Sequence, residues 1–188
     1  MTRREEFPSE LKGLLRTQQI IMAALPAGLF FFLLIAILDR FGGNQPADLF
    51  GILTLAAVAY AAMSLVAQAV VPRMITGAAR RRIAQGTWQP PGLTTPQIAT
   101  LLKRTGTSGQ FMLVNQLRLI LGGAILDGAA FFVVLAYFLE GSPIALGVAV
   151  LLITALLLKF PTAGRVGDWI ENQRRRMEED QLLSGAGS

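Results

Sequence analysis

The sequence predicts an all-α membrane protein with four transmembrane helices, arranged as two hairpins whose short connections face outward. Three observations lead to this fold class. The chain has 188 residues, of which 53% are hydrophobic and only 15% are charged, far below the charge content of a typical soluble domain. The apolar residues are concentrated in long uncharged runs. The basic residues lie almost entirely between these runs.

Four apolar runs are predicted to cross the membrane: residues 20–38, 49–71, 119–139 and 143–158. The first two contain no charged residue, and the third is interrupted only by Asp127. The fourth is short for a hydrocarbon core of about 30 Å, but Lys159 and Phe160 can complete it because lysine extends its ammonium group to the interface. Each run is predicted as an α-helix, since backbone exposed to lipid must satisfy its own hydrogen bonds.

The positions of the basic residues predict the orientation of the chain. All of the 17 lysines and arginines except Arg40 fall in residues 1–19, 72–118 and 159–188. Basic flanks stay on the cytoplasmic side, so both termini and the central segment are expected there. The chain is therefore predicted to be a multi-pass protein of the cell inner membrane, with both termini in the cytoplasm.

This orientation divides the chain into five parts. Residues 1–19 form a cytoplasmic N-terminal segment, 20–71 the first transmembrane hairpin and 72–118 a basic cytoplasmic loop. Residues 119–160 form the second hairpin, and 161–188 a cytoplasmic amphipathic helix with its tail.

The central segment contains the run Arg80, Arg81 and Arg82, which could suggest binding to nucleic acid. No aromatic residues interleave with it and no nucleic-acid module accompanies it, so we expect no nucleic-acid partner. A basic cluster beside a membrane span attracts anionic lipid head groups. The predicted partner of this cluster is therefore the bilayer surface.

The first and third apolar runs match at one constant offset along the chain. The matching pairs are Ile20 and Ile120, Ala24 and Ala124, Gly28 and Gly128, Phe31 and Phe131, Phe32 and Phe132, and Ala36 and Ala136. This similarity predicts a parallel internal repeat, with each unit made of a hairpin and a cytoplasmic helix. Within it, Ala24 with Gly28 and Ala124 with Gly128 form small-xxx-small pairs that allow helices to pack closely.

Two amphipathic helices are expected in the cytoplasmic parts. One begins at Thr94-Thr95-Pro96 and ends near Arg104, before the sequence GTSG. The other lies in the C-terminal segment and carries its apolar residues on a single face. These residues are Val166, Trp169, Ile170 and Met177.

Asp127 is the most unusual residue, because it lies near the middle of an apolar run. Tyr60, Ser64 and Thr154 fall at comparable depths and are predicted as its polar partners. Pro26 is predicted to kink the first helix and to leave a carbonyl without its donor, which a protonated Asp127 could bind. The acid is open to three roles: a hydrogen bond that fixes helix packing or assembly, proton or cation handling, and recognition of a partner or lipid.

The runs RTQQIIMAALPAG, GAILDGAAFFVVLAYFLEG and KFPTAGRVGDWIE resemble those of uncharacterised small four-span bacterial integral membrane proteins. The resemblance covers most of the chain and implies the four-helix bundle, but it brings no activity with it.

The predicted function is a structural or accessory role in the membrane, within an oligomer of this chain or with another membrane protein. The alternative is a small transporter or ion-conducting subunit that uses Asp127. The chain has no cysteine and no histidine, and no nucleophile–base set or phosphate-binding glycine loop is present, so neither an enzyme, nor a metal site, nor a cofactor is expected.

Overall fold

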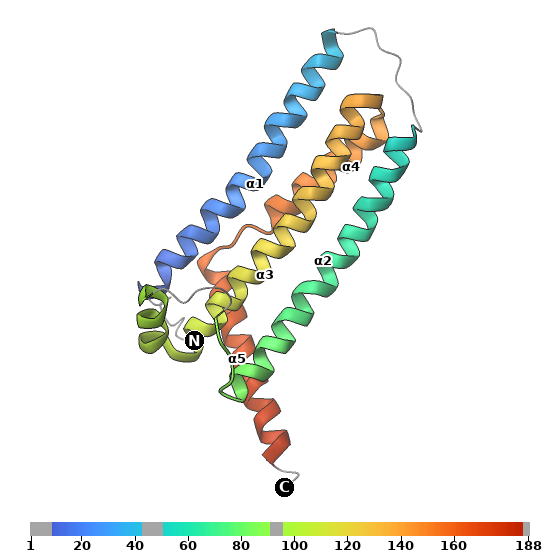
Figure 1. The fold of residues 1–188 in the computed structure, drawn as a ribbon. Helices are drawn as coiled ribbons and strands as arrows, with labels where there is room; N and C mark the ends of the chain where they lie inside the picture. Colours follow the sequence, from blue (N-terminus) through green and yellow to red (C-terminus); the bar gives the residue numbers. More distant parts are fainter. Residues whose placement is uncertain (1–8, 43–50, 91–95, 186–188) are drawn as a thin grey trace, which may run out of the picture. The chain divides into compact units, whose positions relative to one another are not determined.

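The computed structural model describes residues 9–42, 51–90 and 96–185. Five α-helices account for most of them, and these residues contain no strand. The helices are α1 (Ser9–Gly42), α2 (Ile52–Ala84), α3 (Pro96–Glu140), α4 (Pro143–Leu158) and α5 (Ala163–Gly185) (Figure 1). The predicted all-α fold class is confirmed.

Three of the helices are long and apolar enough to cross a membrane. The spanning stretches are Leu11–Gly42 in α1, Ile52–Ala84 in α2 and Ile98–Glu140 in α3. With 16 residues α4 is shorter, and it gives a fourth span only when counted together with α5 as one broken span. Three to four helices of this kind indicate a multi-pass membrane protein.

The helices continue well beyond the apolar runs. The basic cluster lies inside α2, which passes through Pro72, just as α1 passes through Pro26. The predicted cytoplasmic helix is the first part of α3, which begins at Pro96; the expected start at Thr94 and Thr95 lies outside the described residues.

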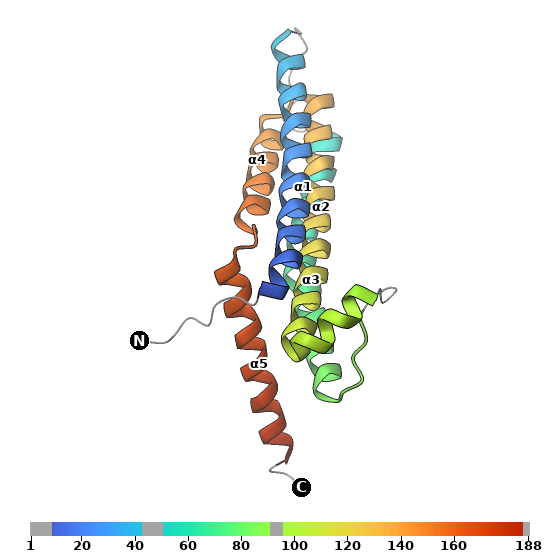
Figure 2. The same ribbon diagram turned by 90° about the vertical axis from the view of Figure 1, so that its left-hand side faces the viewer.

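A break in α3 falls within the GTSG sequence. Gly106 has a φ of 54° and a ψ of −132°, outside the helical region, and Figure 2 shows the change of direction that results. A positive φ carries no steric cost for glycine, which explains why the break occurs at this residue. The predicted end of the first helical piece near Arg104 agrees with this position.

The contacts within the chain divide it into two units. Unit 1 contains Met1–Gln19, Arg73–Arg118 and Pro161–Ser188. Unit 2 contains Ile20–Pro72 and Leu119–Phe160. Helices α1, α2 and α3 contribute residues to both units.

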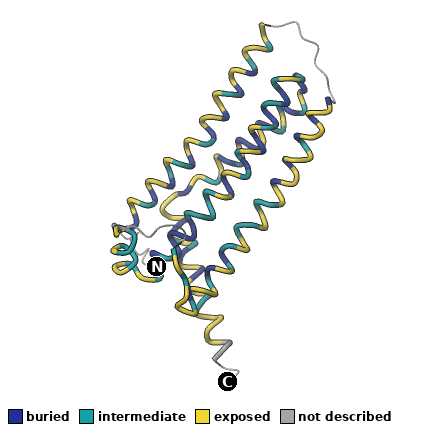
Figure 3. The backbone as a smooth tube through the Cα atoms, viewed as in Figure 1, coloured by how far each residue is buried: buried dark blue, intermediate teal, exposed yellow. Residues whose placement is uncertain are grey.

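The interior of unit 2 is built from small and aliphatic side chains of α1, α2, α3 and α4. In α1 the buried residues Leu29, Leu33 and Ala36 alternate at spacings of four and three, which gives a narrow seam, as Figure 3 shows along the helix. In α2 the corresponding residues are Ala57 and Ala61. The rest of the buried cluster comes from α3 and α4: Leu126, Ala129, Ala130, Val133, Val134, Ala136, Tyr137, Ala145, Ala149, Leu152, Ile153 and Leu156.

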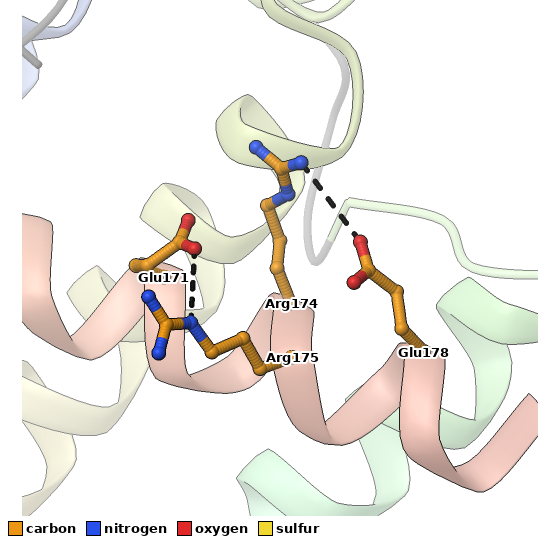
Figure 4. A network of polar contacts seen from close by, with 4 residues as sticks. All are labelled: Glu171, Arg174, Arg175 and Glu178. Carbon is orange, nitrogen blue, oxygen red and sulfur yellow. Dashed lines mark hydrogen bonds and ion pairs between the residues drawn. The ribbon is translucent and has the colours of Figure 1, made fainter.

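The interior of unit 1 includes the apolar face of α5. Val166 and Ile170 are buried in this cluster, and Trp169 and Met177 pack against it, as the amphipathic pattern predicts. Their partners come from α1, α2 and α3: Leu11, Leu15, Ala79, Ile83, Phe111, Met112 and Val114. The outer face of α5 carries ion pairs between residues four apart, Arg175 with Glu171 and Arg174 with Glu178 (Figure 4).

Candidate functional site

Asp127 lies on α3 at the edge between its buried and exposed faces. Leu126 on one side is fully buried in unit 2, whereas Gly128 and Phe131 on the other are exposed. Asp127 itself is half-buried, and its side chain makes no hydrogen bond or ion pair with any residue that the structure describes. A polar group that faces hydrocarbon without a partner is costly, so this carboxyl group needs a partner more than any other group in the span.

Tyr60 is the predicted partner that comes nearest to this region of α3. Its hydroxyl group lies 4.0 Å from the point that a Cβ atom on Gly128 would occupy. Its ring packs edge-on against Phe132, with the ring centroids 5.9 Å apart. Tyr60 therefore reaches α3 next to Asp127, without a hydrogen bond to it in this structure.

The other two predicted partners are placed differently. Ser64 is buried on α2. Thr154 is exposed on α4, where its hydroxyl group donates to the carbonyl oxygen of Val150 at 2.8 Å. Neither side chain hydrogen bonds to Asp127 among the described residues, so the structure does not bring the four groups together as one network.

The small residues predicted to mediate helix packing are not buried against another of the described helices. Ala24, Gly28, Ala124 and Gly128 are all exposed. At Gly28 no atom lies within 4 Å of the position that a Cβ would take. Both pairs leave an open surface of small residues on unit 2, which can still contact another chain.

The close approach in unit 2 occurs instead at Gly122 and Gly123, which sequence reasoning missed. A Cβ atom on Gly123 would lie 3.1 Å from Cδ1 of Leu25 and 3.2 Å from Sδ of Met22, both on α1. On Gly122 it would lie 3.6 Å from Nζ of Lys159. Consecutive side chains on a helix point about 100° apart, so Gly123 and Ala124 lie on different faces. A small-xxx-small pattern alone therefore does not identify the packed face.

Glu140 is a second residue that sequence reasoning missed. Its carboxylate accepts hydrogen bonds from the backbone N–H groups of Leu53 at 2.9 Å and Thr54 at 2.8 Å. The last residue of α3 thus caps the first turn of α2, where N–H groups have no partner within the helix. The carboxyl group passes so close to Gly51 that a Cβ atom there would overlap it. The signal in the sequence was an acid at the end of one apolar run and a glycine at the start of another.

No protein family, characterised protein or solved structure matches the chain.

The functional argument therefore depends on the side chains themselves, and the basic cluster is the remaining candidate. Arg80 is partly buried and its Nε lies 3.1 Å from Oδ2 of Asp180 on α5. Arg81 and Arg82 are exposed. Only these two members are open to an external anionic partner without competition from Asp180.

Proposed function

We propose that the chain is a structural or accessory subunit of a membrane-protein assembly, formed with further copies of itself or with a different membrane protein. The observation that carries this proposal is the half-buried Asp127, which has no hydrogen-bond partner in the described part of the chain. It lies beside Ala124 and Gly128, which are exposed. Another helix can approach closely over small residues and offer a hydrogen-bonding group to the acid.

In this proposal the chain crosses the inner membrane of a bacterial cell four times, as two hairpins related by an internal repeat. Both termini and the basic central segment lie on the cytoplasmic side, where Arg81 and Arg82 attract anionic lipid head groups. We expect no catalytic activity and no cofactor, because the sequence contains no histidine or cysteine and no nucleophile–base set.

The test separates hydrogen bonding from proton transfer at Asp127. Asp127→Asn keeps a side chain that donates and accepts, whereas Asp127→Leu removes both capacities. If the acid holds an assembly, the Asn variant keeps the wild-type stoichiometry in native mass spectrometry and the Leu variant loses it. Asp39→Asn is the matched control, because Asp39 is an exposed acid near the end of α1. An unchanged assembly in the Leu variant would contradict the proposal.

The alternative function is a small transporter or ion-conducting subunit, and the same half-buried acid favours it. This function predicts proton-dependent flux in liposomes containing the purified chain. Asp127→Asn should abolish that flux while the assembly stays intact, because an amide has no carboxyl group to bind and release a proton. Both functions leave the assembly intact in the Asn variant, so the flux through the wild-type chain and its loss in this variant distinguish them.

A further inference from the structure

Arg118, the last residue before the apolar run 119–139, is held in place by an aromatic ring. Its Cζ atom lies 4.8 Å from the centroid of the Trp169 ring on α5. That ring is itself packed edge-on against Phe111, with centroids 6.3 Å apart and an interplanar angle of 86°. A cation over an aromatic ring is attracted by the ring face, so Trp169 restricts the guanidinium group of Arg118 while its N–H groups stay available as donors.

Arg118 lacks the counter-charge that Arg80, Arg174 and Arg175 possess, although it is less exposed than Arg81 and Arg82. Arg174 and Arg175 pair with glutamates on the same helix (Figure 4). Arg118 is half-buried, yet its guanidinium group makes no hydrogen bond or ion pair with any residue in the described ranges. Partial removal of a charge from water without a partner costs free energy, and a bound anion would offset that cost.

A second donor lies on the same face of α3. Residues 111, 115 and 118 follow the spacing of one helical face, and Trp169 contacts both ends of this stretch. Asn115, between them, is 2% exposed, and its Nδ2 atom has no hydrogen-bond partner among the residues described. The Nδ2 atom is shielded from solvent, so of these two groups only the guanidinium group can donate to a phosphate at the surface.

We propose that Arg118, placed over the ring of Trp169, binds the phosphate of an anionic phospholipid head group. The lipid source is favoured because Arg118 directly precedes an apolar run and tryptophan is enriched at the boundary between water and acyl chains. This site is separate from the exposed arginines of α2 and holds one phosphate group. It rests on the proposed membrane location of the chain, but not on the proposed assembly through Asp127.

The test measures lipid preference at Trp169. A Trp88→Phe background leaves Trp169 as the one remaining tryptophan of the two in the chain. The full chain is placed in nanodiscs of phosphatidylcholine that contain either brominated phosphatidylglycerol or brominated phosphatidylcholine. We expect stronger quenching of Trp169 by the anionic lipid at equal mole fraction. Arg118→Gln should weaken this preference about tenfold or more, since a hydrogen bond to a charged group is lost.

Arg176→Gln is the matched control, because Arg176 is an exposed arginine on α5. This variant loses the same charge and should keep the preference. Arg118→Lys is a second variant that keeps the charge but loses the planar stacked group, and it should also show a reduced preference. A wild-type preference in either Arg118 variant would overturn the proposal.

Inorganic phosphate added to nanodiscs of phosphatidylcholine alone tests the soluble source of the same chemistry. A change in Trp169 fluorescence that saturates with phosphate and disappears in Arg118→Gln would overturn the assignment to lipid. Absence of such a change, together with the preference for phosphatidylglycerol, supports it. An Asp127→Leu chain that no longer assembles should still show the lipid preference, so failure of the proposed assembly can be distinguished from failure of this site.

Discussion

Replacement of Gly123 by leucine tests which glycines pack the helices of unit 2. At this position a Cβ atom alone would already lie 3.1 Å from Leu25 and 3.2 Å from Met22. The remaining atoms of a leucine side chain need further space, which Leu25 and Met22 must provide by moving or α1 by shifting away from α3. Gly28→Leu is the matched control, because no atom lies within 4 Å of the Cβ position at Gly28.

The expected cost of Gly123→Leu follows from overpacking, which is about 1 to 3 kcal/mol in a closely packed interior. In water, burial of the new side chain would offset part of this cost. In lipid it does not, because acyl chains are as apolar as leucine and the hydrophobic effect does not favour helix contacts. At Gly28 the same change adds a better helix former, which is worth about 0.5 to 1 kcal/mol and produces no clash.

The measurement is unfolding of the purified chain in mixed micelles with increasing mole fractions of sodium dodecyl sulfate, followed by circular dichroism. Gly123→Leu should unfold at a lower fraction than wild type, and Gly28→Leu at an equal or higher one. Equal destabilisation by both changes, in chains shown to be monomeric, would refute the packing argument. Loss of an oligomer in Gly28→Leu with an unchanged subunit would instead locate a contact between chains on this face of α1.

Three further predictions concern the cap of α2, the interior of unit 1 and the ion pair of Asp180. Glu140→Gln should increase hydrogen exchange in the first turn of α2, and Gly51→Ala should do the same. In the double variant the increase should be smaller than the sum of the two single effects, because both changes disturb one contact. Ile170→Ala should destabilise unit 1 by about 2 to 5 kcal/mol and make α5 sensitive to limited proteolysis, whereas Leu182→Ala on the exposed surface should not. Asp180→Asn should cost less than about 1 kcal/mol in thermal unfolding, since the Asp180 side chain is exposed to solvent although Arg80 is partly buried.

The sequence was sufficient to predict the helical class, because uncharged runs of this length have few alternatives. It also located the helix break, since GTSG contains the glycine that adopts a positive φ. It did not predict that α2 would continue to Ala84 through the basic cluster. That extension occurs because Ala79 and Ile83 are buried in the unit 1 interior, a tertiary contact that local hydropathy does not report.

The contacts of the candidate sites were harder to predict, since they join residues far apart in the chain. The cap that Glu140 provides for α2 depends on backbone groups of Leu53 and Thr54. The stacking of Arg118 on Trp169 likewise joins two segments that sequence patterns treat separately. The charge of Glu140 and of Arg118 indicated that each needs a partner. Only the fold shows which residues these partners are.

The surface of unit 2 shows why the polar group, and not the apolar area, carries the functional argument. In the apolar 18-residue window of each spanning helix, 44% of α3 is buried, against 28% for α1 and 22% for α2, so most of the window is left uncovered in α1 and in α2. In a soluble protein such surfaces would predict a partner. In a bilayer they are satisfied by lipid and predict nothing, because contact with acyl chains costs an apolar side chain no free energy. Asp127 differs, since acyl chains offer it no hydrogen bond, and this is why the proposed assembly and its alternative are both built on this residue.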